Sequence, residues 1–563
     1  MPFAVPSRLR LVPLRSWIAV AALWLAACGD DRGMASSVGL SVGDASGAGS
    51  TTAGNTTPGS TASTGGGAST SGGPLFDVGA SGGATDGGAN MCYVDPDGDA
   101  AGPCGEKAPA DSFDPQVQWA WEGDGDRKQS LVIPLVANLT DDDGDGVITL
   151  CDSPDILVQV FWDYSSYNHD GYLYVLDGAT GAVHTSFATA MRKHTTPAIG
   201  DIDGDGQPEI VGLTVDRKLV AFDPDGTELW RSVAEVDPAI GGYGAIALAN
   251  LDGEGTPEIL LGNQIFDAGG VLLTTLPDVL PHSGWGNATT AADIDGDGAM
   301  EVVLGRSAYR MDGTEVYRVD NVSPGYPQVA DLDGDGQPEI LVLNEQGISL
   351  IRPDGSVTYA NSRPTGAGAS LENWMRPATI HDFDGDDQAE FATASQGIFA
   401  VYESSGQVVW QATVQDITGA SAGTAFDFLG DGSANAIYGD ERNFHAYDEN
   451  GAELLTVPRS SGTIIEYPVV ADVDNDGSAE VVVVSNEGWF KDQTAPLLQV
   501  IRDAQDRWVP ARRIWNQHTY HVTNVREDAT IPAQEPRHWE LLNTFRTQAQ
   551  IDAGGTCKPP PQG

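Results

Sequence analysis

The chain has 563 residues, with 80 acidic and 29 basic side chains and a formal charge of −51. This length permits several domains or one large all-β domain. The charge disfavours binding to nucleic acid or to anionic lipid headgroups, which are polyanions themselves. The acidic residues recur at fixed spacing instead of filling a diffuse tail, so the expected partners of the charge are cations.

Residues 1–27 have the layout of an export signal. Arginines precede an apolar run, Trp17 to Ala27, that is too short to cross a membrane comfortably. The run ends in LAAC at Cys28, which resembles the lipobox of bacterial lipoproteins. That resemblance implies cleavage before Cys28 and membrane attachment through a lipid on its thiol, and plain secretion is the alternative. Gly29 stands where Asp retains some lipoproteins at the inner membrane, so we expect an outer-membrane or cell-surface protein of the cell envelope.

Residues 28–90 are nearly all Gly, Ser, Thr and Ala, a composition that cannot bury enough apolar surface to fold. We expect a flexible linker after the lipid anchor. About 60 residues of this kind reach roughly 40–45 Å, because the span of Gly/Ser chains grows with the square root of length. The linker would hold the folded part, which starts near residue 91, clear of the membrane.

Four further cysteines, Cys92, Cys104, Cys151 and Cys557, suggest two disulfide bonds in an oxidising compartment. Three pairings of four cysteines are possible. We favour Cys92 with Cys104 as a local link, and Cys151 with Cys557 as a tie between the start and the end of the folded part.

An acidic motif of nine residues recurs along the chain and is typified by DIDGDGQPE. Around each copy, an apolar strand runs into the acidic loop, and three more short strands follow with a Gly-containing turn before the last. Repeat periods of this size indicate a propeller or a solenoid, and four antiparallel strands per repeat indicate a propeller blade. The copies start at Asp141, Asp201, Asn250, Asp293, Asp331, Asp382, Asp427 and Asp472, which are 38 to 60 residues apart.

The sequence therefore predicts an all-β fold, a β-propeller over residues 131–505. Eight blades match the eight motif copies, and seven blades with one divergent unit packed outside is the alternative. Within a lead-in over residues 91–130, Asp114 to Trp121 looks like a lone fourth strand. We expect it to complete the last blade, because an open array would expose strand edges. Residues 506–563 would form a closing segment.

The motif D-x-D-G-D-G-x-x-[DE], repeated this often, resembles the FG-GAP or VCBS repeat family, which includes the propeller of integrin α subunits. The similarity covers roughly residues 113–505. The resemblance implies a calcium-bearing β-propeller of seven or eight blades. It does not imply one function, because such folds host many.

The motif has the chemistry of a Ca²⁺ site. Side chains at positions 1, 3, 5 and 9 can converge on one point, and Gly at positions 4 and 6 permits tight winding. Ca²⁺ accepts six to eight oxygen ligands in flexible geometry, whereas Mg²⁺ demands a near-ideal octahedron. The predicted ligands are Asp201, Asp203, Asp205 and Glu209; Asn250, Asp252, Glu254 and Glu258; Asp293, Asp295, Asp297 and Glu301; Asp331, Asp333, Asp335 and Glu339; Asp382, Asp384, Asp386 and Glu390; and Asp472, Asp474, Asp476 and Glu480.

Two copies depart from this pattern. In the Asp427 loop, Leu429 replaces the second carboxylate and Asn435 the last, which puts occupancy in doubt. The first loop lacks an acid at position 9, and we expect its ligands to be Asp141, Asp143, Asp145 and Asp152. Calcium in these loops would be structural, because carboxylates held this close repel one another without a cation. Ordinary acidic turns are the alternative.

The C-terminal stretch from Arg507 to Pro532 is rich in Arg, Trp, Tyr and His. One interpretation is a segment that covers the closure of the ring and pairs with its acids. A second is an exposed aromatic surface that stacks on a sugar or a peptide. A third is a transition-metal site at His518 and His521.

Motifs of known catalytic machinery are not evident in the sequence. Some polysaccharide lyases also use calcium-containing propellers, so an enzyme that cleaves acidic glycans is the alternative. Such a site would need basic residues gathered at the central channel, and the sequence offers Lys193, His194, Arg376 and His381 near strand starts. We favour an exported, lipid-anchored, calcium-binding β-propeller that acts as a monomeric surface adhesion or ligand-binding module. Its expected ligand is a protein or a glycan.

Overall fold

The computed structural model describes residues 102–109, 112–162, 170–238, 240, 244–278, 288–364, 374, 376–416, 421–488, 495–552 and 555–560. These residues belong to the second of two compact units, Asp86–Gly563. The predicted leader, the lipid site Cys28 and most of the predicted linker belong to the first unit, and they lie outside the described residues together with Cys92. No helix in the described ranges is long and apolar enough to cross a membrane.

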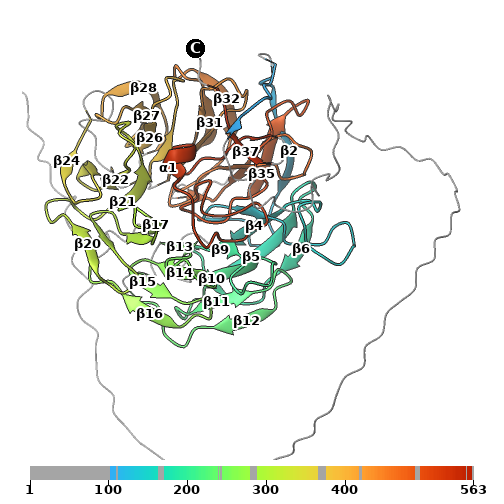
Figure 1. The fold of residues 1–563 in the computed structure, drawn as a ribbon. Coiled ribbons are helices and arrows are strands. Elements are labelled where there is room, and N and C mark those ends of the chain that lie inside the picture. The colour runs from blue at the N-terminus through green and yellow to red at the C-terminus, as the bar shows by residue number, and fades with distance from the viewer. Residues whose placement is uncertain are drawn as a thin grey trace, which may run out of the picture. The chain divides into compact units, whose positions relative to one another are not determined.

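Eight antiparallel sheets make up nearly all of the described unit, and each holds four strands that follow one another in hydrogen-bonded order. Figure 1 shows the sheets succeeding one another around the unit in the colour order of the chain, with the first strands towards the middle and the fourth strands at the rim. The first strands are β3 (Leu135–Ala137), β9 (Ala198–Gly200), β13 (Gly244–Ala249), β17 (Thr290–Ala292), β21 (Tyr326–Ala330), β25 (Thr379–His381), β29 (Gly423–Phe426) and β33 (Val469–Ala471).

The second strands are β4 (Asp155–Val160), β10 (Glu209–Leu213), β14 (Glu258–Leu261), β18 (Glu301–Val303), β22 (Glu339–Asn344), β26 (Glu390–Ser395), β30 (Asn435–Gly439) and β34 (Glu480–Val484). The third strands are β5 (Asp170–Asp177), β11 (Leu219–Phe222), β15 (Gln264–Phe266), β19 (Ser307–Tyr309), β23 (Gly347–Ile351), β27 (Ile398–Tyr402), β31 (Asn443–Tyr447) and β35 (Leu498–Asp503). The fourth strands are β6 (Val183–Ser186), β12 (Glu228–Arg231), β16 (Leu272–Thr275), β20 (Glu315–Arg318), β24 (Val357–Ser362), β28 (Val408–Thr413), β32 (Glu453–Pro458) and, in the eighth sheet, β2 (Pro115–Trp121).

Smaller elements complete the unit. Strand β7 (Met191–Arg192) pairs with β5, and β8 (Thr195–Thr196) runs parallel to β13. A separate three-stranded sheet joins β1 (Gly102–Pro103), β37 (Gly555–Lys558) and β36 (Ile551–Asp552). The one helix in the described residues is α1 (His538–Leu541).

Burial distinguishes the inner strands from the fourth ones. Strand β34, with the sequence EVVVV, is buried along its whole length, whereas β16, with the sequence LLTT, alternates between half-buried and exposed residues. A run of β-branched residues suits a strand covered on both faces, and alternation suits a strand with one face in water. Turns before the fourth strands need a positive φ, which Gly226 and Gly355 supply at 87° and 79°.

The eighth sheet joins the two ends of the repeat region. Strand β2, at the start, pairs antiparallel with β35, near the end, with Val117 opposite Ile501. The pairing predicted for this N-terminal segment is thus confirmed. Trp119 of β2 also donates from its indole nitrogen to the carbonyl of Gly178 at 2.7 Å, which links the eighth sheet to the first. Pairing of β2 leaves the outer edge of β35 covered.

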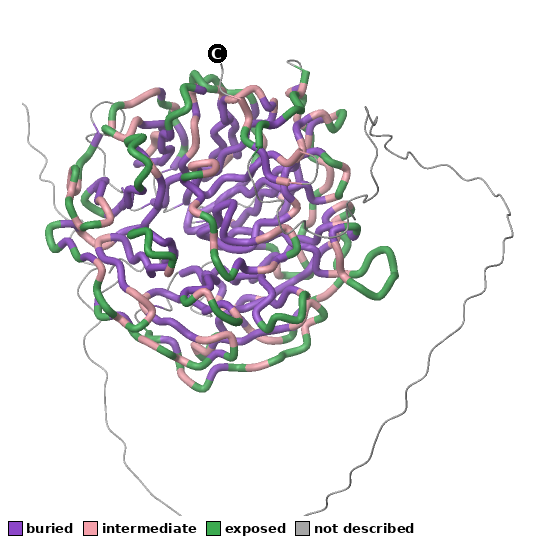
Figure 2. Tube along the Cα trace, in the orientation of Figure 1, coloured by how far each residue is buried: buried purple, intermediate pink, exposed green. Residues whose placement is uncertain are grey.

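The C-terminal segment, residues 506–552, bonds to the first strand, or to the residue just before it, in all eight sheets. Figure 1 shows this segment in dark red across the middle of the unit, and Figure 2 shows the middle as mostly buried. Its groups cover strand edges that would otherwise hold unpaired amides and carbonyls. The contacts are Trp515 with Val136, Asn516 with Ile199, Gln517 with Leu248, Thr519 with Thr289, His538 with Val329, Phe545 with Ile380, Arg546 with Thr424, and Gln548 with Val470.

The disulfide bonding differs from the prediction. Cys104 is bonded to Cys557, so the favoured pairings of Cys104 with Cys92 and of Cys151 with Cys557 are wrong. The cause is the sheet of β1 and β37, which places Gly102 beside Cys557 and brings together residues 453 positions apart. Cys151 is disulfide-bonded as well.

Candidate metal centres

Each acidic loop connects the first strand of a sheet to its second strand. The strand geometry therefore fixes both ends of the loop, and the glycines between them adopt the left-handed conformation, with φ of 82° at Gly204 and 86° at Gly206. Carboxylate oxygens meet inside the loops. Ligand atoms within 4.8 Å of one another come from Asp201, Asp203 and Glu209, from Asp293, Asp295 and Asp297, and from Asp141, Asp143 and Asp152.

The glutamate at position 9 is held the same way in six loops. The backbone N–H of the residue at position 2 donates to its Oε2 atom, which fixes the carboxylate against the start of the loop. The pairs are Ile202 with Glu209 (2.8 Å), Leu251 with Glu258 (2.8 Å), Ile294 with Glu301 (3.1 Å), Leu332 with Glu339 (2.9 Å), Phe383 with Glu390 (2.8 Å) and Val473 with Glu480 (2.9 Å).

Several other oxygens of these loops are buried without a hydrogen bond from the described residues. In the last loop they are Oε1 of Glu480 and Oδ1 of Asp472, and in the third loop Oδ1 of Asn250. A buried oxygen without a partner costs about 1–3 kcal/mol. A hard cation with oxygen ligands would remove that cost, so the residues present fit Ca²⁺.

Burial raises the pKa of the position-9 glutamates, and the other carboxylates of each loop raise it further. The same causes raise the pKa of Asp472 to about 8. These shifts measure how unfavourable the charged loops are when they hold no cation. The pKa is about 8 for Glu209, about 7 for Glu258, Glu301 and Glu339, and about 9 for Glu390.

We expect the calcium-free protein to lose stability as pH rises. Its folded glutamates keep their protons up to pH 7 to 9, whereas glutamates of an unfolded chain titrate near pH 4.3. The stability from these protons is therefore fully present below about pH 4.3 and is lost as pH rises through the folded pKa values. Melting temperatures of dialysed protein at about pH 5.5 and 8.5 would show the fall, and saturating calcium should abolish it. A calcium-free protein that is more stable at the higher pH would contradict the prediction.

Two arginines that the sequence did not single out contact the acidic loops from within their own sheets, and Arg537 of the C-terminal segment lies 2.9 Å from Asp293. Arg310 lies 2.7 Å from carboxylate oxygens of both Asp295 and Asp297, and Arg352 lies 2.6 Å from Asp333. Arg310 and Arg352 each lie three residues before the Gly of the turn between the third and fourth strands, the position that Asp223 occupies in the second sheet. That position is the sequence signal from which their contacts with the loops could have been inferred. An arginine supplies part of the positive charge that a metal would bring, so these two loops should depend less on calcium.

The loops at Asp141 and Asp427, whose sequences depart from the motif, differ in how well the structure supports a metal site. Asp152 accepts hydrogen bonds from the backbone N–H groups of Asp142 (2.9 Å) and Thr149 (2.7 Å), which places its carboxylate in the first loop as predicted. Asp145 is exposed, and its carboxylate accepts the N–H of Val147 at 2.9 Å. In the Asp427 loop, burial raises the pKa of Asp427 to about 6, and the loop lacks a second and a last carboxylate, so it remains the weakest candidate.

The candidate catalytic residues already have partners. Arg376 is fully buried and forms an ion pair with Asp416. The ammonium of Lys193 lies 4.7 Å from the ring centre of Phe161. Burial lowers the pKa of His381 to about 4, which removes a base that would work near neutral pH.

The aromatic residues of the C-terminal segment do not form an exposed surface. Trp515 and Tyr520 are 0% exposed, and Trp508 is 3% exposed, so the interpretation of these residues as an exposed sugar-binding face is wrong. His518 packs against Tyr467, with 5.0 Å between ring centres, and its predicted partner His521 packs elsewhere. The segment is buried because it covers the first strands.

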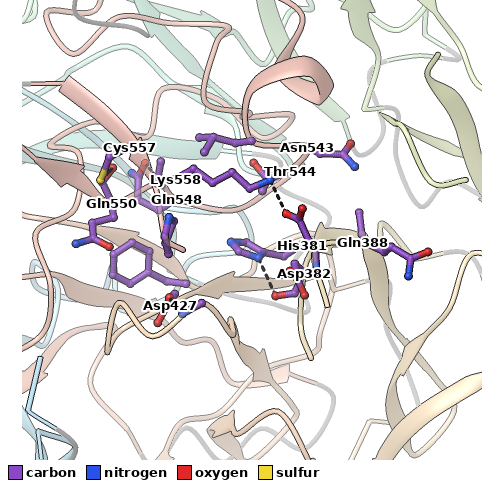
Figure 3. A pocket seen from close by; sticks show the side chains of 17 residues that line it. His381, Asp382, Gln388, Asp427, Asn543, Thr544, Gln548, Gln550, Cys557 and Lys558 are labelled. Carbon is purple, nitrogen blue, oxygen red and sulfur yellow. Dashed lines mark hydrogen bonds and ion pairs between the residues drawn. The ribbon is translucent and has the colours of Figure 1, made fainter. Parts of the chain in front are cut away.

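A cavity of about 60 Å³ lies between the acidic loops of the sixth and seventh sheets and the C-terminal segment (Figure 3). His381 and Gln548 point into it, and Lys558 lies at its side, where its ammonium pairs with Asp387 at 2.8 Å. Ligand pockets measure roughly 300–1,000 Å³. This cavity therefore suits ordered water better than a substrate.

Comparison with known proteins agrees with this architecture. Residues 331–393 match the model of the FG-GAP-like repeat, which confirms the resemblance for the fifth sheet and the start of the sixth. No curated protein sequence is detectably similar to the chain. The described unit is all-β, built of four-stranded antiparallel sheets, and similar to β-propeller-like structures.

The structure resembles the biofilm matrix protein Bap1 of V. cholerae, with a TM-score of 0.64 and 21% sequence identity over 77% of this chain and 99% of that one. The rhamnogalacturonan lyase YesW matches with a TM-score of 0.49 and 18% identity, over 77% of this chain and 80% of its own. A rhamnogalacturonan lyase of Bacillus licheniformis matches with a TM-score of 0.45 and 18% identity, over 80% of this chain and 83% of its own. At these identities the likeness concerns the fold alone.

Proposed function

We propose that the protein is an exported, lipid-anchored β-propeller of eight blades, stabilised by calcium in its acidic loops, that acts as a ligand-binding or adhesion module at the cell surface. The export signal and the LAAC sequence before Gly29 support the anchor at Cys28. The eight sheets, with β2 completing the eighth, support the closed ring. The buried carboxylate oxygens without hydrogen bonds support structural calcium.

The observation that carries a binding role, as opposed to catalysis, is the course of the C-terminal segment. It bonds to the first strand, or to the residue just before it, in all eight sheets, where a glycan-cleaving propeller would need open space for its substrate. Three of the four basic residues considered for catalysis are engaged in the fold: Arg376 pairs with Asp416, Lys193 packs on Phe161, and His381 loses basicity by burial. A ring fastened at its middle is a rigid support for contacts at its rim.

A cavity at the rim offers a contact of the right chemistry. It measures about 220 Å³, below the roughly 300–1,000 Å³ of a pocket that encloses a whole ligand, so it would hold only part of a glycan. It lies between the fifth and sixth sheets and is lined by Tyr359, Arg363, Ser405 and Gln407. An aromatic ring, a guanidinium, a hydroxyl and an amide together can stack on a sugar and hydrogen-bond its hydroxyl groups. The net charge of −51 would repel acidic glycans, so we propose a neutral glycan as the ligand.

The test measures binding of the calcium-loaded protein to immobilised neutral and acidic glycans. The protein carries Cys28→Ala so that it is not lipidated. We expect a neutral glycan to be retained without release of cleaved sugar, and Arg363→Ala to weaken retention at least tenfold. Arg231→Ala, a change of another partly exposed rim arginine, is the matched control. Release of unsaturated sugars from an acidic glycan would instead establish the lyase alternative. Loss of membrane association on Cys28→Ala would test the anchor separately.

A further inference from the structure

Two histidines and a glutamate meet inside the C-terminal segment, away from the acidic loops. His521 and His538 are 2% and 1% exposed, and the side chain of Glu535 is 8% exposed. The two imidazole ring centres are 4.4 Å apart, and Nε2 of His521 lies 2.6 Å from Oε1 of Glu535. The three residues offer ligand atoms that all lie within 4.8 Å of one another.

Hydrogen bonds to carbonyl groups determine which nitrogen of each ring is free. His521 Nδ1 lies 3.1 Å from the carbonyl oxygen of Thr519, and His538 Nε2 lies 2.6 Å from that of Val329. A carbonyl oxygen only accepts, so both of these nitrogens must donate. In the neutral rings, the lone pairs therefore lie on Nε2 of His521 and Nδ1 of His538.

Both lone pairs lack an ordinary partner. Nδ1 of His538 is buried and has no hydrogen-bond partner among the described residues. Nε2 of His521 faces a carboxylate oxygen, and two acceptors at 2.6 Å repel each other unless a proton or a cation lies between them. A proton on His521 would explain that contact alone, whereas a metal ion would explain both nitrogens.

Hydrogen bonds with neighbouring residues orient His521, Glu535 and His538, as hydrogen bonds to the ligands do in metal sites. A carbonyl orients each histidine, and the hydroxyl of Thr523 donates to Oε1 of Glu535 at 2.8 Å. Two imidazole nitrogens and one carboxylate suit Zn²⁺ and related ions, whereas Ca²⁺ prefers oxygen ligands only. Bound at about 2.0–2.1 Å from each atom, such an ion would hold the nitrogen and the carboxylate oxygen about 3.3 Å apart, so Glu535 would move back by less than about 1 Å.

We propose that His521, Glu535 and His538 form a binding site for one divalent transition-metal ion of the zinc class, separate from the calcium loops. The site joins residues of the C-terminal segment that are 17 positions apart, and His538 connects it to β21 through the carbonyl of Val329. A bound ion would fasten α1 and the middle of the segment to the first strands. A small pocket lined by Thr523, His538 and Leu541 adjoins it and leaves room for a water ligand.

The test uses the full chain with excess calcium, so that the acidic loops are filled, after treatment with a chelator selective for transition metals. Titration with Zn²⁺ or Co²⁺ should give one ion per chain, and the Co²⁺ complex should show the visible absorption of a low-coordinate nitrogen and oxygen site. His538→Gln and Glu535→Gln should each weaken binding at least tenfold.

His445→Gln is the matched control, because His445 also lies beside carboxylates, Asp440 at 3.1 Å and Glu453 at 2.6 Å, but is not one of the three proposed ligands. It should keep the bound ion. Absence of Zn²⁺ and Co²⁺ binding to the wild-type protein in excess calcium would overturn the proposal, and so would unchanged binding by a folded His538→Gln protein. If that variant fails to fold, the wild-type titration and the less buried Glu535→Gln variant decide.

Discussion

Removal of calcium is expected to unfold the protein or to lower its melting temperature more than any single substitution does. A site held at about 100 times its dissociation constant contributes about 2.7 kcal/mol to stability. Six sites of this kind would contribute about as much as the whole stability of an ordinary domain, about 5–15 kcal/mol. Thermal unfolding with millimolar calcium and with chelator, together with a count of bound ions, measures the effect.

Two matched variants would show which loops are responsible for the calcium-dependent rise in melting temperature. Glu209→Gln removes a ligand from a loop that has no ion pair with an arginine or lysine among the described residues, so it should cost one ion and much of the calcium-dependent rise in melting temperature. Glu339→Gln makes the same change in a loop where Arg352 contacts Asp333, and its effect should be smaller. Equal melting temperatures with calcium and with chelator, and no bound metal, would reduce the loops to ordinary acidic turns.

Replacement of Trp515 by Ala is expected to destabilise the folded unit by about 3–5 kcal/mol, the usual cost of removing a fully buried tryptophan. Trp515 is 0% exposed, and its ring stacks on Tyr520 with 4.5 Å between centres. Its backbone N–H and carbonyl both bond to Val136 of β3, at 2.8 and 3.0 Å. The variant should therefore loosen the C-terminal segment where it meets the first sheet, and chemical unfolding in calcium would measure the loss.

Trp162→Ala is the control for this experiment, since Trp162 is 49% exposed and should change stability by no more than about 0.5 kcal/mol. Trp515→Phe keeps an aromatic ring and should recover part of the loss. If Trp515→Ala and Trp162→Ala were equally stable, the C-terminal segment would be a loosely attached cover and not a fastening of the ring.

The acidic loops could be recognised from the sequence because their chemistry is local. Glu209 lies eight residues after Asp201, and the strands on either side fix the loop between them. The order of strands could be inferred for the same reason, since each sheet uses consecutive segments. Even the pairing of β2 with β35 followed from the need to cover a strand edge.

The arginines over the loops were missed because their contacts run between separate turns of one sheet. Arg310 lies 15 residues after Asp295 in the chain, and its side chain reaches back across the sheet. The disulfide of Cys104 with Cys557 was missed because a parallel pairing of β1 with β37 brings them together, and such pairing leaves no pattern in the sequence.

The sequence by itself determined the repeat, the all-β class and the acidic loops, because each depends on residues within one strand or one turn. Only the tertiary structure decided the role of the C-terminal segment. Trp515, Tyr520 and His521 have the composition of an exposed binding surface, and their burial depends on strand edges from sheets hundreds of residues earlier in the chain. The chemistry of a side chain can be read from the sequence. Its burial depends on distant parts of the chain, because the C-terminal segment bonds to backbone groups that the first strands of the sheets would otherwise leave unpaired.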